Sequence, residues 1–154
     1  MIKINNLSKN YGKEVHALRS VNLHIKPGEF VSIVGQSGSG KSTLIRLIIA
    51  EEKSDNGQII IGGWDITHLK NHEIPTLRRQ LGVIFQDFKL LSKKTVFENV
   101  SFAMEACGLK SADIKKTVNQ MLSLVGLKDK EDRYPHQLSG GEQQRVAIAR
   151  SLVH

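Results

Sequence analysis

The chain is poor in the features that would place it outside a reducing compartment or inside a membrane. Cys107 is the only cysteine among its 154 residues, so no disulfide can form within the chain, and a reducing cytoplasm fits. No apolar run approaches the roughly 20 residues needed to cross a bilayer. Residues 1–6 do not have the pattern of a signal peptide. We therefore expect any membrane role to depend on a separate partner.

Clustered charge and metal-ligand spacing are also missing. The net charge of +7 is compatible with nucleic acid or anionic lipid as a partner. However, the lysines are dispersed, and the longest clusters are pairs such as Lys93-Lys94. No arginine- and aromatic-rich strand suggests RNA stacking, and the six histidines show no metal-ligand spacing. We expect one globular domain, or a piece of one, with no nucleic-acid partner.

What the chain does contain is a phosphate-binding loop. Residues 35–42 have the sequence Gly-Gln-Ser-Gly-Ser-Gly-Lys-Ser, which matches G-x-x-x-x-G-K-[ST] at every fixed position. The apolar residues 30–34 before it predict a buried strand, and residues 42–50 predict a helix, in the order that this motif requires. Lys41 would supply a cation for the outer phosphates, and Ser42 a hydroxyl for Mg²⁺. A dinucleotide fingerprint is excluded, because Thr43 stands where that pattern needs glycine.

A second motif follows about one hundred residues later. Residues 138–143, Leu-Ser-Gly-Gly-Glu-Gln, predict a helix start with Ser139 as N-cap and Glu142 closing a capping box. Gly140 and Gly141 in its first turn cost roughly 1 kcal/mol each relative to alanine, which a purely structural cap does not need. By themselves these residues support a well-capped helix and an anion site on its free N–H groups about equally.

Together, the two motifs resemble the ATP-binding subunits of ABC transporters, and the resemblance covers the whole chain. In that family the serine-glycine segment of one subunit caps the ATP held on the P-loop of the other. The resemblance therefore implies a homodimer that binds ATP and Mg²⁺. The ATP-binding residues that it implies are Tyr11, which would stack on adenine, and Gly35, Ser37, Gly38, Ser39, Gly40, Lys41, Ser42 and Thr43. Those implied to contact the partner's ATP are Ser139, Gly140, Gly141 and Glu142, where Glu142 replaces the commoner glutamine.

A third segment carries a further functional residue by the same resemblance. Residues 83–86 predict a short buried strand that ends in Gln86. In the family this glutamine reaches the Mg²⁺ and the attacking water, so the resemblance implies Lys41 and Gln86 as catalytic residues and Ser42 and Gln86 as Mg²⁺ ligands. The apolar residues Phe88, Leu90 and Leu91 follow this strand. They are candidates either for contact with a membrane partner or for a place in the core.

The subfamily is indicated by residues 77–91 and 94–100, together with the Glu-Glu-Lys sequence at 51–53. These stretches are similar to ATPases of the bacterial FtsE–FtsX cell-division system. The resemblance implies a peripheral protein on the cytoplasmic face of the bacterial plasma membrane, with an FtsX-like permease as partner. ATPases of methionine or lipoprotein transporters are an alternative. A DNA-maintenance ATPase is disfavoured, since the helical segment is short and lacks a coiled coil and zinc cysteines.

The patterns predict an α/β fold with an N-terminal antiparallel β part, and the resemblance implies a P-loop NTPase of the ABC type with an α-helical subdomain. We expect a partial ATP-binding domain over residues 1–154, with a P-loop and β part at 1–87, a helical subdomain at 88–137 and the signature segment with its helix at 138–154. Alternating and helical patterns also predict individual elements. These are strands at 2–4, 21–25 and 58–61, a loop at 64–71, a short helix after Pro75, and helices at 96–107 and 111–125, the last capped by Ser111.

The acids for hydrolysis are not among these residues. In the family the Walker B acid, the catalytic glutamate and the switch histidine lie in a segment that would follow residue 154. Its strands separate residues 31–34 from residues 81–85 in the family's sheet. We therefore expect an incomplete core sheet and a chain that is marginally stable or prone to aggregate. The resemblance implies ATP hydrolysis for the family, while for these residues nucleotide binding without turnover stays open as an alternative.

Overall fold

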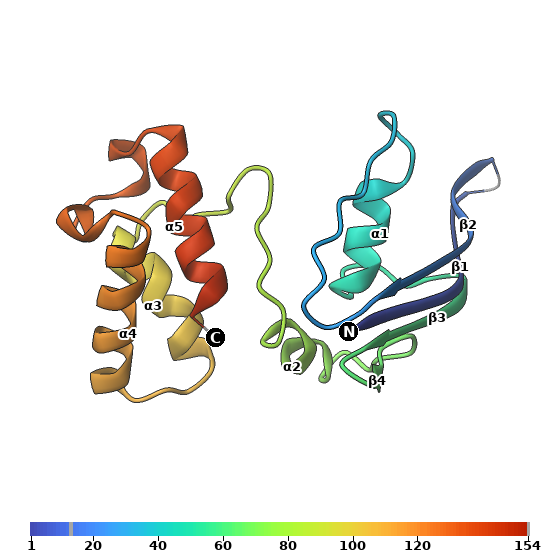
Figure 1. Cartoon of the computed structure of the whole chain (residues 1–154), viewed down its shortest axis with the longest axis horizontal. Coiled ribbons are helices and arrows are strands. Elements are labelled where there is room, and N and C mark those ends of the chain that lie inside the picture. Colours follow the sequence, from blue (N-terminus) through green and yellow to red (C-terminus); the bar gives the residue numbers. More distant parts are fainter. Residues whose placement is uncertain (13, 154) are drawn as a thin grey trace. The chain divides into compact units, whose positions relative to one another are not determined.

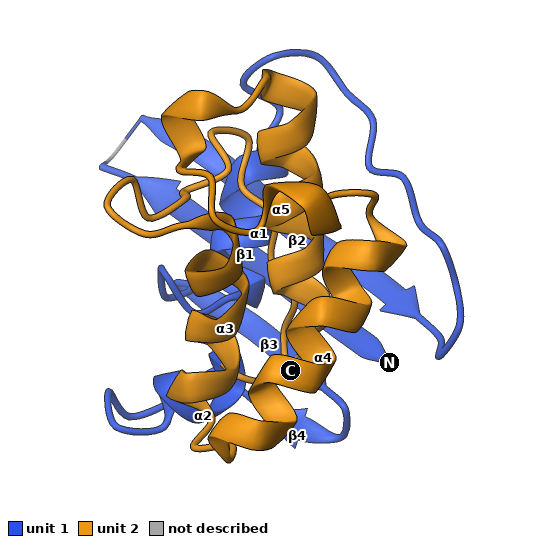
Figure 2. Ribbon diagram, turned by 90° about the vertical axis from the view of Figure 1, so that its left-hand side faces the viewer, with its two compact units in different colours: residues 1–78 blue, residues 79–154 orange. Residues whose placement is uncertain are grey.

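The computed structural model describes residues 1–12 and 14–153 and contains both strands and helices (Figure 1). The chain divides into two compact units, Met1–Arg78 and Arg79–His154 (Figure 2). The division at residues 87 and 137 that the sequence suggests remains a prediction.

The first unit is built on an antiparallel sheet of four strands in the order β2-β1-β3-β4. The strands are β1 (Ile2–Tyr11), β2 (Val15–Ile25), β3 (Asn56–Ile61) and β4 (Trp64–Asp65). Ile4 of the central strand β1 pairs with Leu23 on one side and with Ile59 on the other. The sequence patterns predicted β1, β2 and β3 correctly, although all three extend further than predicted. The predicted loop at 64–71 begins with the two residues of β4.

Two helices complete the first unit, and α1 lies against the sheet (Figure 1). Helix α1 spans Lys41–Ile48, and it buries Leu44, Leu47 and Ile48 along one face, as helical spacing requires. The short helix α2 spans Ile74–Arg78 and includes the predicted Pro75. The Arg78 guanidinium donates to the carbonyl oxygens of Ile49 at 3.1 Å and Ala50 at 3.2 Å. These bonds satisfy carbonyls just beyond the end of α1.

Two predicted strands do not form. Residues 30–34 and 81–85 contain no strand, and Phe30 is 97% exposed and Val34 85%. Ile84 and Phe85 are exposed as well. A strand needs a neighbour for its ladder of hydrogen bonds, and no strand of the described residues pairs with either segment. The prediction of buried strands was therefore wrong, while the α/β class and the incomplete core sheet are confirmed.

The second unit is helical, with α3 (Val96–Ala106), α4 (Ser111–Leu124) and α5 (Gly140–Leu152) packed together. The short 3₁₀ helices η1 (Lys128–Lys130) and η2 (Pro135–Gln137) connect α4 to α5. The predicted helices are confirmed, but Ser111 is not the cap of α4. Lys110 occupies that position and makes no side-chain cap, because Ser111 already lies within the helix. The core of the unit consists of Val96, Val100, Met104, Ile114, Val118, Leu122, Leu127, Leu138, Val146, Ala149 and Val153.

Asn99 on α3 fixes the loop that leads into this helix. Its side chain is fully buried. The amide oxygen accepts from the Leu91 N–H at 2.8 Å, and the amide nitrogen donates to the carbonyl oxygens of Leu91, Lys94 and Thr95 at 2.9–3.1 Å. A buried amide satisfied on both ends holds the backbone in one conformation. Residues 91–95 are therefore anchored to α3.

Candidate functional site

The phosphate-binding loop has the backbone conformation that its glycines allow. Gly38 and Gly40 have φ values of 77° and 89°, in the left-handed region. A side chain at Gly40 would also place its Cβ 2.4 Å from the carbonyl oxygen of Ala17 and 2.9 Å from Leu18 Cδ2, both on β2. A Cβ built on Gly35 would lie 2.7 Å from Ser39 Oγ, a side-chain atom that can rotate away. The loop conformation and the neighbouring strand therefore require glycine at position 40.

Lys41 folds back over the loop. Its Nζ donates to the carbonyl oxygens of Gly35 at 2.9 Å and Gln36 at 2.7 Å, and it lies 3.3 Å from Ser39 Oγ. The ammonium group is thus held beside the loop by neutral acceptors, and no carboxylate of the described residues forms an ion pair with it. A neutral environment leaves its positive charge available to an anion.

The start of α1 carries unpaired amides. The first helical hydrogen bond runs from the Leu44 N–H to the Gly40 carbonyl at 2.9 Å, and no side chain caps the helix. Among the described residues, no hydrogen-bond acceptor meets the N–H groups of Lys41, Ser42 and Thr43. These amides and the Lys41 ammonium fit a polyphosphate, and the Ser42 hydroxyl fits a hard cation beside it. Ser37 and Ser39 lie exposed in the same loop.

Tyr11 lies next to this helix. It ends β1, is 39% exposed, and its hydroxyl oxygen is 3.5 Å from Thr43 Oγ1. The hydroxyl donates to the Glu52 carboxylate, which also forms an ion pair with Arg46 at 3.3 Å. Sequence reasoning missed the contact between Tyr11 and Glu52. The Glu-Glu-Lys sequence at 51–53 was noted only as a subfamily marker, although it placed an acid near the end of α1.

The second motif forms the predicted capping box at the start of α5. The Glu142 N–H donates to Ser139 Oγ at 3.4 Å, and Glu142 Oε2 accepts from both the N–H and the hydroxyl of Ser139 at 2.8 Å. Lys130 forms an ion pair with Glu142 Oε1. The Lys130 ammonium and the two Ser139 donors lower the pKa of Glu142 to about 2. This carboxylate is therefore ionised at neutral pH.

Nothing in the described chain explains the two glycines of this motif sterically. A Cβ built on Gly140 would meet no atom within 4 Å, and one on Gly141 only Arg145 NH1 at 3.9 Å. Ser139, Gly140 and Gly141 are all exposed. The helix start is thus open, with room for a group from outside the unit.

Gln86 is exposed, at the start of a turn that α5 holds in place. Phe88 and Lys89 have left-handed φ values of 56° and 45°. The Arg150 guanidinium donates to their carbonyl oxygens, at 2.7 Å and 2.8 Å. Its burial lowers the pKa of Arg150. Leu90 packs against the helical core, as the core alternative for this residue expected.

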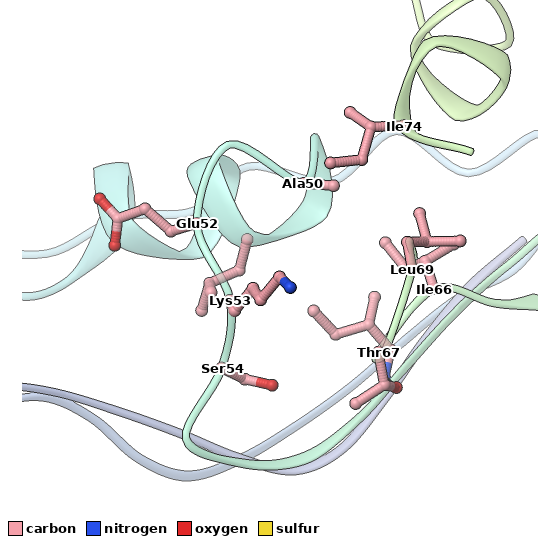
Figure 3. Close-up of a pocket in the computed structure, with 10 residues that line it drawn as sticks. Ala50, Glu52, Lys53, Ser54, Ile66, Thr67, Leu69 and Ile74 are labelled. Atoms are coloured by element: carbon pink, nitrogen blue, oxygen red, sulfur yellow. The ribbon is translucent and has the colours of Figure 1, made fainter. Parts of the chain in front are cut away.

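The predicted site residues therefore form separate groups in the two units. The first unit brings together Tyr11 and the loop with the start of α1, residues 35–43. The second unit contains Gln86 and the capped start of α5, residues 139–142. A small cavity in the first unit lies between the end of α1 and β3, where Leu47, Ala50, Ile59 and Ile66 help to line it (Figure 3). Its volume of about 20 Å³ has room for one water molecule, far less than a nucleotide needs.

No helix of the described residues combines the length and the apolar character needed to span a bilayer. The sequence family model described as ABC transporter matches residues 18–154. The chain is 54% identical to the cell division ATP-binding protein FtsE of Bacillus subtilis over all 154 residues, which span 68% of that protein's length. It is 47% identical to the methionine import ATP-binding protein MetN of Helicobacter pylori, again over the whole chain but only 47% of that protein.

Solved structures show the same fold. The dimeric structure of the bacterial ABC transporter cassette MJ0796 superposes with a TM-score of 0.91 at 40% identity, and covers 99% of this chain and 69% of its own. The post-hydrolysis dimer of MJ0796, bound to ADP and Pi, has a TM-score of 0.90 at 39% identity, with the same coverage.

Proposed function

This chain belongs to the ABC transporter family of ATP-binding subunits, and we propose that it binds ATP with Mg²⁺ on residues 35–43. Members of the family hydrolyse ATP. The observation that carries the proposal is the group of donors at the start of α1. In the described part of the chain, three amides without a hydrogen-bond acceptor and one ammonium without a carboxylate partner converge there. In this arrangement, Lys41 and the amides bind the phosphates.

The remaining roles are those that the family resemblance implies. Tyr11, which is 39% exposed and whose hydroxyl lies beside Thr43, takes the adenine. By this resemblance, Ser42 and Gln86 would each contribute a ligand to Mg²⁺, and the ion would supply charge neutralisation at the bond that is cleaved. Gln86 orients the attacking water. Lys41 and Gln86 are the catalytic residues of this proposal.

We further propose that two copies of the chain face each other across two nucleotides. The open start of α5 would meet the ATP on the partner's loop, with Ser139, Gly140, Gly141 and Glu142 at the contact. The steric openness around Gly140 supports this role, because the described chain itself has no use for the missing side chains. The dimeric structures of MJ0796 support it as well.

The membrane system served by the chain is proposed to be of the FtsE–FtsX kind. Its partner would then be an FtsX-like permease, and the protein would lie peripherally on the cytoplasmic face of a bacterial plasma membrane. Identities of 54% and 48% to FtsE of B. subtilis and Streptococcus pneumoniae support this assignment. The 47% identity to MetN supports methionine import as the second candidate. The two candidates are separated by complementation. The FtsE assignment predicts rescue of the division defect in a strain lacking FtsE, without rescue of methionine uptake in a strain lacking MetN.

The test of nucleotide binding is a titration with a fluorescent ATP analogue. We expect Lys41→Ala to abolish binding, because it removes the cation held beside the loop. Lys70→Ala, which removes an exposed lysine of the same unit, serves as the matched control and should leave the affinity unchanged. Equal affinity of Lys41→Ala and the unmodified chain would overturn the assignment of this loop.

A further inference from the structure

Lys130 lies outside both motifs but contacts the second one. It ends the 3₁₀ helix η1, and its ammonium meets Glu142 Oε1 across 12 residues of chain. The Lys130 side chain is 37% exposed and that of Glu142 16%. The other carboxylate oxygen of Glu142 accepts from the N–H and hydroxyl of Ser139. Both oxygens of this glutamate are therefore occupied by donors.

A glutamate at this position poses an electrostatic problem. The start of α5 would receive the polyphosphate of the partner's ATP, and Glu142 lies in its first turn. An ionised carboxylate repels a phosphate at short range, and the repulsion is large where water is excluded. The Ser139 hydroxyl also donates its only proton to the carboxylate, so Glu142 competes with the phosphate for that donor. A neutral glutamine would avoid the charge repulsion.

We propose that Lys130 is a positioning residue that lets Glu142 coexist with the partner's nucleotide, by neutralising the carboxylate and holding one of its oxygens toward η1. This inference rests on the proposed function, because it assumes that the start of α5 meets ATP. With Lys130 in place, the pair Lys130–Glu142 has no net charge, and the helix start retains its positive dipole end toward the phosphate. Lys130 is thus needed only because position 142 is a glutamate.

This dependence gives a specific signature in a double-mutant cycle. In the natural background, Lys130→Met leaves an uncompensated carboxylate at the nucleotide contact. In a Glu142→Gln background the same substitution removes a lysine that has no carboxylate to neutralise. The effect of Lys130→Met should therefore be large in the first background and small in the second. A residue that acts independently of Glu142 would have the same effect in both, and the unfolding measurements below separate a coupling that only supports the fold.

The readout is ATP-dependent self-association of the whole chain, measured by sedimentation with ATP and EDTA, because withholding Mg²⁺ prevents hydrolysis. We expect Lys130→Met to weaken association about tenfold in the natural background and less than about twofold in the Glu142→Gln background, which corresponds to a coupling of the size seen between contacting residues. Lys130→Arg should retain association, because it keeps the charge. Lys128→Met is the matched control, since this exposed lysine of the same 3₁₀ helix has no ion pair among the described residues.

Binding of the fluorescent ATP analogue and urea unfolding are measured for each variant. These controls identify variants that have lost nucleotide binding or the folded state. Equal effects of Lys130→Met in both backgrounds, or none in either, would overturn the inference. A chain that binds ATP but does not self-associate would overturn it too, and would leave the loop assignment intact. A chain that binds no ATP would overturn the proposed function itself, and this inference with it.

Discussion

Arg150 of α5 donates a hydrogen bond of 2.7 Å to the backbone carbonyl of Phe88, 62 residues earlier in the chain. A second bond of 2.8 Å reaches the carbonyl of Lys89. Both acceptors belong to residues with left-handed φ values, a conformation that non-glycine residues rarely adopt without support. The guanidinium therefore holds the turn after Gln86 to the helix that begins at the second motif.

Arg150→Leu should loosen this turn. Hydrogen bonds from a charged donor contribute about 1.5–3 kcal/mol, so we expect a loss of about 2 kcal/mol in the free energy of unfolding. Hydrogen exchange of residues 86–91 should accelerate. Arg150→Lys should not restore protection, since one ammonium cannot reproduce the planar pair of donors. Arg145→Leu, an exposed position on the same helix, is the control, and equal exchange in both leucine variants would contradict this role of Arg150.

Tyr11 should matter through its ring. Stacking of a base on an aromatic side chain is worth about 1–3 kcal/mol by alanine substitution. We therefore expect Tyr11→Ala to weaken ATP binding about tenfold in a calorimetric titration. Tyr11→Phe keeps the ring but loses the hydrogen bond to Glu52, so its affinity for ATP should lie between those of the unmodified chain and of Tyr11→Ala. If Tyr11→Ala binds ATP as well as the unmodified chain, adenine does not lie on this ring.

Glu142 should make the free energy of unfolding of the chain sensitive to acid. Its pKa is about 2 in the folded chain and lies near the ordinary value of 4.5 when unfolded, because Lys130 and Ser139 stabilise the carboxylate. The unfolded state therefore binds more protons between these values, and the contribution of Glu142 to stability is complete above pH 4.5 and is lost as the pH falls toward 2. In denaturant melts across this range, the free energy of unfolding of Glu142→Gln should depend less steeply on pH than that of the unmodified chain. The difference in slope should correspond to at most about one bound proton. The same pH dependence of the free energy of unfolding in both proteins would show that folding does not stabilise the Glu142 carboxylate.

The purified 154-residue chain should be marginally stable. Phe30 is 97% exposed and Val34 85%, and neither of the buried strands predicted at residues 30–34 and 83–86 forms. Apolar surface of this kind promotes association between molecules. We expect a melting midpoint below about 50 °C or aggregation on heating, and a cooperative melt above about 50 °C would contradict this expectation.

Local patterns predicted much of this molecule. The glycine-rich loop and α1 follow from residues close together in the chain, and so does the capping box between Ser139 and Glu142. The strand predicted at residues 30–34 failed, because a strand depends on a neighbour that its own residues do not specify. The prediction that Ser111 caps α4 was wrong, because the helix begins one residue earlier than predicted and Lys110 occupies the cap position.

Contacts between distant residues were not predictable from the sequence. Glu52 and Lys130 belong to no motif, and their partners Tyr11 and Glu142 are separated from them by other elements. Tyr11 itself was identified only by resemblance to a family, since a lone tyrosine at the end of a strand has no distinctive pattern. The folded chain alone brings these pairs together.

Hydrolysis is a separate question from binding. Steady phosphate release by the purified chain, lost in Lys41→Ala, would eliminate the alternative of a nucleotide-binding module without turnover. Binding of DNA that weakens with salt at physiological ionic strength would favour the DNA-maintenance alternative.

The central claim is that the amides at the start of α1 bind the phosphates of ATP. Its most direct test is a ¹⁵N–¹H correlation spectrum of the chain, recorded with ATP and with adenosine. We predict that ATP produces the largest shifts at the amides of Lys41, Ser42 and Thr43, and that adenosine, which lacks phosphates, leaves them in place. Unchanged signals from these three amides in saturating ATP would contradict the account.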